Sequence, residues 1–214
     1  MRFTDSEVEI PVGPATLGGS LSVPEDTKVL VLFVHGSGSS RHSPRNQFVA
    51  QTLNAAGVAT LLFDLLTRAE EAVDLRTAQY RFDIRLLVKR LVHATRWAMK
   101  TAPELRIGYF GSSTGGGAAL VAAAELPREV SAVVSRGGRP DLAGEALPLV
   151  QAPTLLIVGG EDDVVIDLNE QAKAQMHCEV KMEIVPGATH LFEEPGALER
   201  VADLAADWFL RRLP

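Results

Sequence analysis

The sequence is almost free of cysteine, because Cys178 is the only one among its 214 residues. No internal disulfide can form, and the cysteine content gives no indication of an oxidising compartment. Apolar runs long enough to span a membrane are also absent, and the first seven residues lack the apolar core of a secretory signal peptide. We therefore expect a cytoplasmic protein without a membrane partner.

Positive charge is scarce as well. The 21 Lys and Arg residues are outnumbered by 27 Asp and Glu residues, which gives a formal net charge of −6. A protein that binds nucleic acid usually carries a basic face, so we expect no nucleic-acid partner. A length of 214 residues suffices for a full core. Because no repeat, low-complexity tract or linker divides the chain, we predict a single domain over residues 1–214.

Glycine is concentrated around one serine. Residues 106–120 predict a buried strand, a tight turn and a helix, and the turn Gly111-Ser112-Ser113-Thr114-Gly115 fits the pattern G-x-S-x-G. A serine at such a turn has strained backbone geometry, so its neighbours must be small. The following helix directs its first N–H groups toward the same point, where they would stabilise a developing negative charge. The stretch predicts a nucleophile at Ser113; a glycine-rich turn without chemistry is the alternative.

Short apolar runs alternate with helical patterns along the rest of the chain. Val29–Val34 is continuously apolar, which is typical of a central strand covered on both faces. Val8–Ile10 and Leu17–Val23 predict a hairpin, whereas the mixed, polar residues 65–78 predict a loop. Further strands are expected at 58–63, 130–135, 155–158 and 180–185, and helices at 43–55, 80–100, 168–176 and 197–213. This alternation predicts an α/β fold with a mostly parallel sheet and helices on both faces.

Polar loops follow four of the predicted strands, and ligands of open parallel sheets bind at the carboxyl ends of the strands. These loops hold His35-Gly36-Ser37-Gly38, Ser113, the neighbours Asp162 and Asp163, and His190. The order Ser, Asp, His is that of nucleophile, orienting acid and base in enzymes with a nucleophile elbow. We therefore predict a catalytic triad whose acid is Asp162 or Asp163.

Together these motifs resemble those of the α/β-hydrolases, and among them the small dienelactone-hydrolase-like enzymes without a lid. The resemblance extends from the strand at residue 29 to the terminal helix, through His35-Gly36, Gly111-x-Ser113-x-Gly115, Gly159-Gly160-x-Asp162 and Gly187-x-x-His190. It implies an α/β-hydrolase fold with an N-terminal antiparallel hairpin. Dienelactone hydrolases proper have cysteine where this chain has Ser113, so we expect general ester hydrolysis rather than lactone specificity.

The resemblance implies a role for each site residue. Ser113 attacks an acyl carbonyl, His190 accepts and returns the proton, and Asp162, which fits the family pattern better than the residue after it, orients the imidazole. The backbone N–H groups of Thr114 and Ser37 would form the oxyanion hole. We predict a carboxylic ester hydrolase that acts on a small ester without a metal or other cofactor. Alternatives are a thioesterase, amidase or acyltransferase with the same triad, and a non-catalytic binding protein with the hydrolase fold.

Arginines are unexpectedly frequent in two of the predicted loops for a chain of net negative charge, at positions 41, 45, 136 and 139. The arginine fork suits carboxylates, and dienelactone hydrolases act on carboxylate-bearing substrates. One hypothesis is therefore that Arg41, Arg136 and Arg139 bind a carboxylate of the substrate. The alternative is that these arginines are solvated or pair with Asp64, Glu70 or Asp141.

The length of the segment between the strands predicted at 130–135 and 155–158 indicates which substrate sizes the site can accept. Many lipases insert a lid after the strand that corresponds to residues 130–135, but residues 136–152 leave little room for one. We therefore predict an uncapped site that accepts short soluble esters and is not activated at a lipid–water interface.

Overall fold

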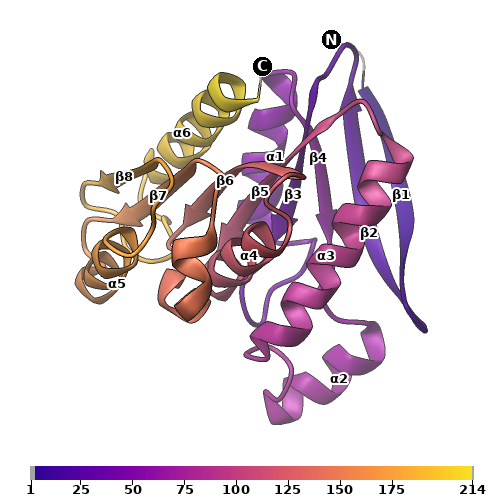
Figure 1. Ribbon diagram of the computed structural model, residues 1–214, viewed down its shortest axis with the longest axis horizontal. Coiled ribbons are helices and arrows are strands. Elements are labelled where there is room, and N and C mark those ends of the chain that lie inside the picture. Colours follow the sequence, from indigo (N-terminus) through magenta and orange to yellow (C-terminus); the bar gives the residue numbers. More distant parts are fainter. Residues whose placement is uncertain (1–2, 214) are drawn as a thin grey trace.

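The central sheet has eight strands in the order β1-β2-β4-β3-β5-β6-β7-β8 (Figure 1). The structure is a computed structural model, which describes residues 3–213. β1 (Phe3–Val12) and β2 (Ala15–Pro24) form an antiparallel hairpin, and β2 also pairs antiparallel with β4 (Ala59–Phe63). All other neighbouring strands are parallel. The predicted α/β fold is confirmed, and the hairpin strands extend beyond their predicted ends.

The remaining strands are β3 (Val29–Val34), β5 (Arg106–Ser112), β6 (Val130–Arg136), β7 (Thr154–Gly159) and β8 (Val180–Val185). Every residue of β3, β4 and β7 is buried. Their continuous apolar runs follow from this, because helices cover both faces of the sheet. β8 forms one edge of the sheet and is only partly buried.

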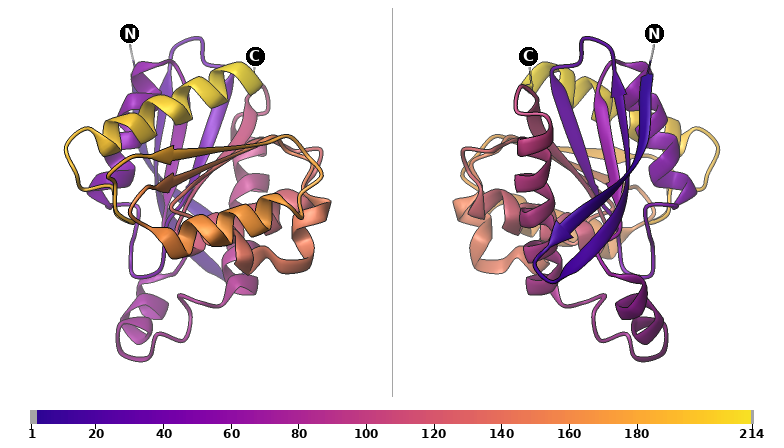
Figure 2. Two further views of the ribbon diagram at one scale, coloured as in Figure 1. Left: turned by 90° about the vertical axis from the view of Figure 1, so that its left-hand side faces the viewer. Right: turned by 90° about the vertical axis from the view of Figure 1, so that its right-hand side faces the viewer.

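Helices cover the two faces in two groups (Figure 2). α1 (Pro44–Ala55) and α6 (Ala197–Arg212) pack on one face, whereas α3 (Ile84–Thr101), α4 (Thr114–Glu125) and α5 (Asp163–Lys173) pack on the other. Successive residues of a strand point to opposite faces, so the buried side chains form two separate cores. The parallel strands end at a common edge, where the predicted site residues lie.

The segment predicted as a loop at residues 65–78 contains a helix, α2 (Arg68–Thr77). Thr67 and Glu70 form a reciprocal capping box at its start, which stabilises a helix terminus. The loop prediction was wrong because α2 buries only Asp74 and therefore lacks an apolar stripe. α2 stands apart from the sheet in both views (Figures 1 and 2).

Two further segments differ in detail from the prediction. α5 begins at Asp163 rather than at Leu168. Between β6 and β7 the chain forms only 3-10 turns, over Pro140–Leu149, with a kink at Gly144 where φ is 47°. Residues 3–213 thus include no lid domain, as predicted. None of the described helices is both long and apolar enough to cross a membrane.

Candidate active site

Ser113 occupies the sharp turn between β5 and α4. Its φ of 51° and ψ of −124° are rare for an L-residue and cost roughly 1–3 kcal/mol of strain. Three backbone hydrogen bonds hold it: its N–H donates to Arg136 O (3.3 Å), and its carbonyl accepts from the N–H groups of Gly116 and Arg139 (both 3.0 Å). The surroundings therefore maintain the backbone geometry of a nucleophile elbow.

The glycines of the motif are required by close packing. A Cβ on Gly115 would overlap the carbonyl oxygen of Val34, and one on Gly111 would lie 2.6 Å from Gly115 O. A Cβ on Gly36 would lie 3.1 Å from Ser113 Cβ. The loop that follows β3 therefore passes directly beside the serine, which a larger side chain in either segment would prevent.

His190 is paired with Asp162. Nδ1 of the imidazole lies 2.7 Å from Asp162 Oδ2, and Nε2 is the ring nitrogen left for a substrate or a nucleophile. Asp162 is the N-cap residue of α5, but its side chain makes no capping hydrogen bond and remains available to the histidine. Asp163 lies exposed in the first turn of α5, so the structure joins His190 to the first of the two aspartates.

One loop contacts both the serine and the histidine. Its residue Arg139 donates its N–H to Ser113 O, and a Cβ on Gly137 would lie 3.6 Å from His190 Cε1. No hydrogen bond joins Ser113 and His190 in the part of the chain that the structure describes. Catalytic hydrogen bonds are often long before substrate binds and shorten in the complex, so the missing bond does not count against the predicted triad.

His35 braces the loop after β3. Its Nε2 accepts a hydrogen bond from Leu65 N–H (3.0 Å), so the proton is on Nδ1, which donates to Gly36 O (2.9 Å). Burial lowers the pKa of His35, against the opposing effects of the Gly36 carbonyl and of the Asp64 and Glu71 carboxylates. A neutral imidazole with both nitrogens engaged fixes the backbone that leads to the predicted oxyanion residue.

The predicted oxyanion residues Ser37 and Thr114 contact each other in an unforeseen way. The Ser37 N–H donates to the side-chain oxygen of Thr114, with 2.9 Å between N and Oγ1. The amide expected to face an oxyanion is therefore already engaged by the hydroxyl of the residue that follows the nucleophile.

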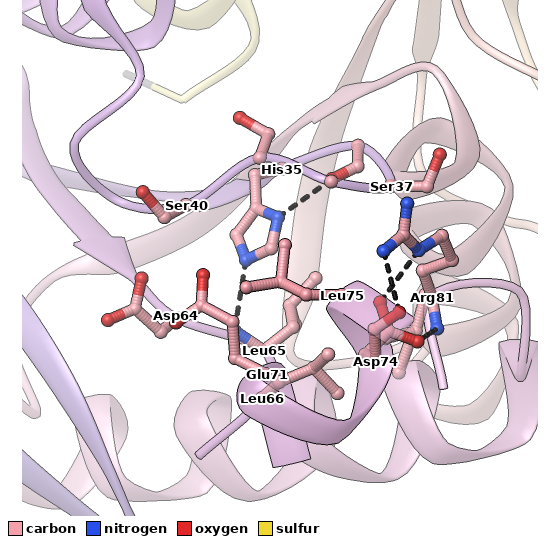
Figure 3. Close-up of a pocket in the computed structure, with 14 residues that line it drawn as sticks. His35, Ser37, Ser40, Asp64, Leu65, Leu66, Glu71, Asp74, Leu75 and Arg81 are labelled. Carbon is pink, nitrogen blue, oxygen red and sulfur yellow. Dashed lines mark hydrogen bonds and ion pairs between the residues drawn. The ribbon is translucent and has the colours of Figure 1, made fainter. Parts of the chain in front are cut away.

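A small pocket lies between the loop after β3 and α2 (Figure 3). It has about 40 Å³ of open space, comparable to one or two water molecules. Leu75 of α2 lines it and is 72% exposed. The pocket adjoins Ser37, one of the two predicted oxyanion residues.

The pocket also contains an arginine that the sequence did not single out. Arg81 donates from Nε and Nη2 to Asp74, which also accepts the N–H groups of Tyr80 and Arg81. Its guanidinium is directed toward the loop at Ser37 (Figure 3). The only sequence signal for this region was the T-x-x-E capping pattern at the start of α2.

Residues 3–213 hold no cluster of His, Cys, Asp and Glu that could bind a metal ion.

Two of the three arginines proposed for a substrate carboxylate have carboxylate partners within the chain. Arg41 pairs with Asp64 and reaches Glu7 at 3.3 Å. Arg139 forms a two-pronged pair with Asp141, at 2.8 and 2.7 Å. These ion pairs correspond to the alternative interpretation of the loop arginines.

Arg136 differs from the other arginines because it is buried without a carboxylate. It is 8% exposed, and its Nε and Nη1 have no hydrogen-bond partner among residues 3–213. Nη2 makes a long hydrogen bond to Asn46 Oδ1 (3.5 Å), which also accepts from Ser112, and the guanidinium lies 5.8 Å from the ring centre of Phe192. Burial, and next the Arg45 cation, lower the pKa of Arg136 to about 10. Its enclosed nitrogens leave little surface for a ligand.

The fold is that of the α/β-hydrolases, and Ser113, Asp162 and His190 lie in loops that follow three of its strands. A family model described as "Alpha/beta hydrolase domain" matches residues 27–206. The chain belongs to this family.

A solved structure described as a dienelactone hydrolase from Anabaena variabilis ATCC 29413 is 57% identical, with a TM-score of 0.98 and full coverage of both chains. The esterase Est1E from Butyrivibrio proteoclasticus is 18% identical and covers 96% of this chain and 98% of its own, with a TM-score of 0.80. At that identity the likeness concerns the fold alone.

Curated relatives from two strains of Mycobacterium tuberculosis are 57% identical over 212 residues and carry a phosphoribosyl transferase name. The match covers 98% of this chain but only 47% of each relative. The chain therefore spans about half the length of these relatives, and their name refers to a longer protein.

Proposed function

We propose that the protein is a serine hydrolase that cleaves small carboxylic esters through an acyl-serine intermediate. The observation that carries the proposal is the hydrogen bond of 2.7 Å between His190 and Asp162, next to a serine held at positive φ. The hydroxyl, the imidazole and the carboxylate provide the three groups that acyl transfer from an ester to serine needs. The likeness to a dienelactone hydrolase at 57% identity supports a hydrolase.

In the first half of the reaction, Ser113 Oγ adds to the acyl carbon while its proton moves to His190 Nε2. Asp162 stabilises the imidazolium and keeps the ring in one tautomer. When the tetrahedral intermediate collapses, the ester C–O bond breaks, and the alcohol leaves with the proton from His190. In the second half, a water molecule loses a proton to His190 and adds to the acyl carbon. The bond between this carbon and Ser113 Oγ then breaks, Ser113 takes the proton back from His190, and the carboxylic acid leaves.

The surroundings of Ser113 support short substrates. The pocket beside Ser37 is small, and the segment between β6 and β7 inserts only 3-10 turns. We therefore expect the site to bind a short acyl or alcohol group. Thioesters and amides would pass through the same acyl-enzyme, so the triad does not determine which leaving group is preferred and an assay has to identify it.

A fluorophosphonate probe and a panel of p-nitrophenyl esters test the proposal. We expect the probe to label Ser113, as located by mass spectrometry, and acetate or butyrate esters to be hydrolysed faster than long-chain emulsions. The variant Ser113→Ala should lose labelling and turnover and keep its thermal transition, because it only removes a hydroxyl. A label on Ser112, or a wild-type protein that is neither labelled nor active on any ester or thioester, would contradict the proposal.

A further inference from the structure

The Thr114 hydroxyl is the group to which the loop after β3 is attached. It accepts the Ser37 N–H at 2.9 Å from a residue 77 positions away in sequence. Thr114 is only 4% exposed, and its hydroxyl donates no hydrogen bond to any of residues 3–213. A threonine hydroxyl can donate one hydrogen bond as well as accept, so its proton remains available.

Other threonines in helices of this protein use that proton differently. Thr95, Thr52 and Thr101 each donate to the carbonyl four residues earlier, which is the usual local choice within a helix. Thr114 lies in the first turn of α4, and the residue four positions earlier, Phe110, belongs to β5. Its hydroxyl is therefore free of the local bond and points to the loop that carries Ser37.

This position coincides with the place where an oxyanion would be bound. The backbone N–H of Thr114 is among the first N–H groups of α4, which have no partner within the helix. The second predicted donor, the Ser37 N–H, is directed at Thr114 Oγ1. The Ser37 amide is therefore already paired, and the Thr114 hydroxyl beside it is the group that still has a proton to donate.

We propose that the Thr114 side-chain O–H is the second oxyanion donor, in place of the Ser37 amide. This inference rests on the proposed ester hydrolysis. As Ser113 Oγ bonds to the acyl carbon, the carbonyl π electrons move to the oxygen, and the Thr114 N–H and O–H both donate to it without transferring a proton. The Ser37 N–H stays on Thr114 Oγ1, where it polarises the hydroxyl and strengthens the bond that it donates.

The alternative is that the Ser37 N–H is the oxyanion donor and that the Thr114 hydroxyl only competes for it. Removing the hydroxyl would then free the Ser37 N–H for the oxyanion and raise the rate. Under our proposal, removing the hydroxyl takes away the donor that contacts the oxyanion. The sign of the rate change therefore distinguishes the two.

The test compares Thr114→Val, Thr114→Ala and Thr114→Ser with wild type on one short p-nitrophenyl ester. We expect kcat to fall by roughly 100- to 1000-fold in the Val and Ala variants, the loss typical of one oxyanion donor, with KM little changed. Thr114→Ser keeps the hydroxyl and should stay within a few-fold of wild type. Thr101→Val, an exposed threonine at the end of α3, is the matched control and should retain full activity. Because Val could disturb the local packing, the Ala variant shows whether the loss also occurs with a smaller side chain. Thermal unfolding shows whether each variant is folded.

Each outcome bears on a different claim. A kcat for Thr114→Val and Thr114→Ala equal to or above that of wild type would overturn the inference and leave the proposed hydrolase intact. Equal losses in the Ser, Val and Ala variants would also overturn it, because the loss would then not follow the hydroxyl. A wild-type protein without turnover and without label on Ser113 would overturn the proposed function and this inference together.

Discussion

His190 Nδ1 and Asp162 Oδ2 are 2.7 Å apart, and the loops that carry them are separately anchored. On the histidine side, the N–H and hydroxyl of Thr189 donate to the two oxygens of Glu194, at 3.0 and 2.6 Å. On the aspartate side, Asp162 N–H donates to Gly159 O at the end of β7. Both loops are thus held by hydrogen bonds of their own, and under the proposed function this support would limit the reorganisation of the imidazole during catalysis.

The first prediction distinguishes the two adjacent aspartates. Asp162→Asn should lower kcat by about 10⁴-fold, as in a serine protease that loses this role, because the amide favours the wrong tautomer of His190. Asp163→Asn is the matched control, and its exposed side chain at the start of α5 should make the change mild. Burst kinetics with a p-nitrophenyl ester measure both, and the reverse ranking would show that the acid has been misassigned.

The sequence was sufficient for the sheet and for the triad candidates because their signals are local. Continuous apolar runs mark the buried strands, and G-x-S-x-G marks the strained turn at Ser113. α2 was missed because it covers no core and so has no apolar period to detect. The Ser37–Thr114 bond depends on one side-chain rotamer and on two segments far apart in sequence, neither of which a linear pattern contains.

The environments of the loop arginines could also be predicted only in part from the sequence. The sequence offered Asp64 and Asp141 as possible partners, and the structure pairs them with Arg41 and Arg139. That Arg136 is buried without a carboxylate depends on which way the last residue of β6 faces. Residue 135 points toward α4, so residue 136 points to the opposite face, beside Asn46 of α1.

The second prediction follows from this buried cation. Arg136→Met should raise the free energy of unfolding, because even buried ion pairs can be replaced by apolar groups of similar volume with a change from zero to a gain of about 1–4 kcal/mol, and Arg136 makes only one long hydrogen bond, to Asn46. The pKa of Arg136 is lowered from 12.5 to about 10, so the folded state disfavours the charged form. The resulting penalty is fully present below pH 10 and is relieved only as the pH rises from about 10 toward 12.5.

Denaturant unfolding at pH 7.5 measures this change in the free energy of unfolding, because at that pH the cost of burying the charged guanidinium is fully present. Arg106→Met is the control, because it removes the same charge from an exposed position at the opposite end of the adjacent strand β5. It should change the free energy of unfolding by less than about 0.5 kcal/mol. A destabilised Arg136→Met protein with an unaffected control would show that the guanidinium is compensated in the folded state.

The third prediction concerns acid and the attachment of α2. Burial would raise the pKa of Asp74, but hydrogen bonds from the Tyr80 and Arg81 N–H groups and the Arg81 side chain lower it overall, below 3.8. A carboxyl whose pKa is lower in the folded state stabilises the fold above its unfolded pKa, and this stabilisation is lost as the pH falls below about 4. Asp74→Asn should therefore reduce the protection of the α2 amides at pH 6 and have much less effect at pH 2.5.

Hydrogen exchange, expressed as protection factors to remove the intrinsic pH dependence of the exchange rate, provides the measurement. The amides of α6, on the far face of the sheet, provide an internal control and should be unchanged by Asp74→Asn. An equal loss of protection at both pH values would show that the negative charge of Asp74 is not what holds α2.

The last prediction assigns substrate selectivity to α2. Leu75 lines the small pocket beside Ser37 and is 72% exposed, so it can be shortened without opening a core cavity. Leu75→Ala should enlarge a pocket of about 40 Å³ and raise the ratio of kcat/KM for butyrate over acetate esters. At roughly 0.8 kcal/mol for each methylene newly buried, the ratio should rise about fourfold if one of the two extra methylenes of butyrate is buried and about 15-fold if both are. Leu149→Ala, at a 63% exposed leucine of the 3-10 segment outside this pocket, should leave the ratio unchanged. Equal ratios in wild type and both variants would mean that the acyl group binds elsewhere, because enlarging the pocket would then not change the preference for the longer acyl chain.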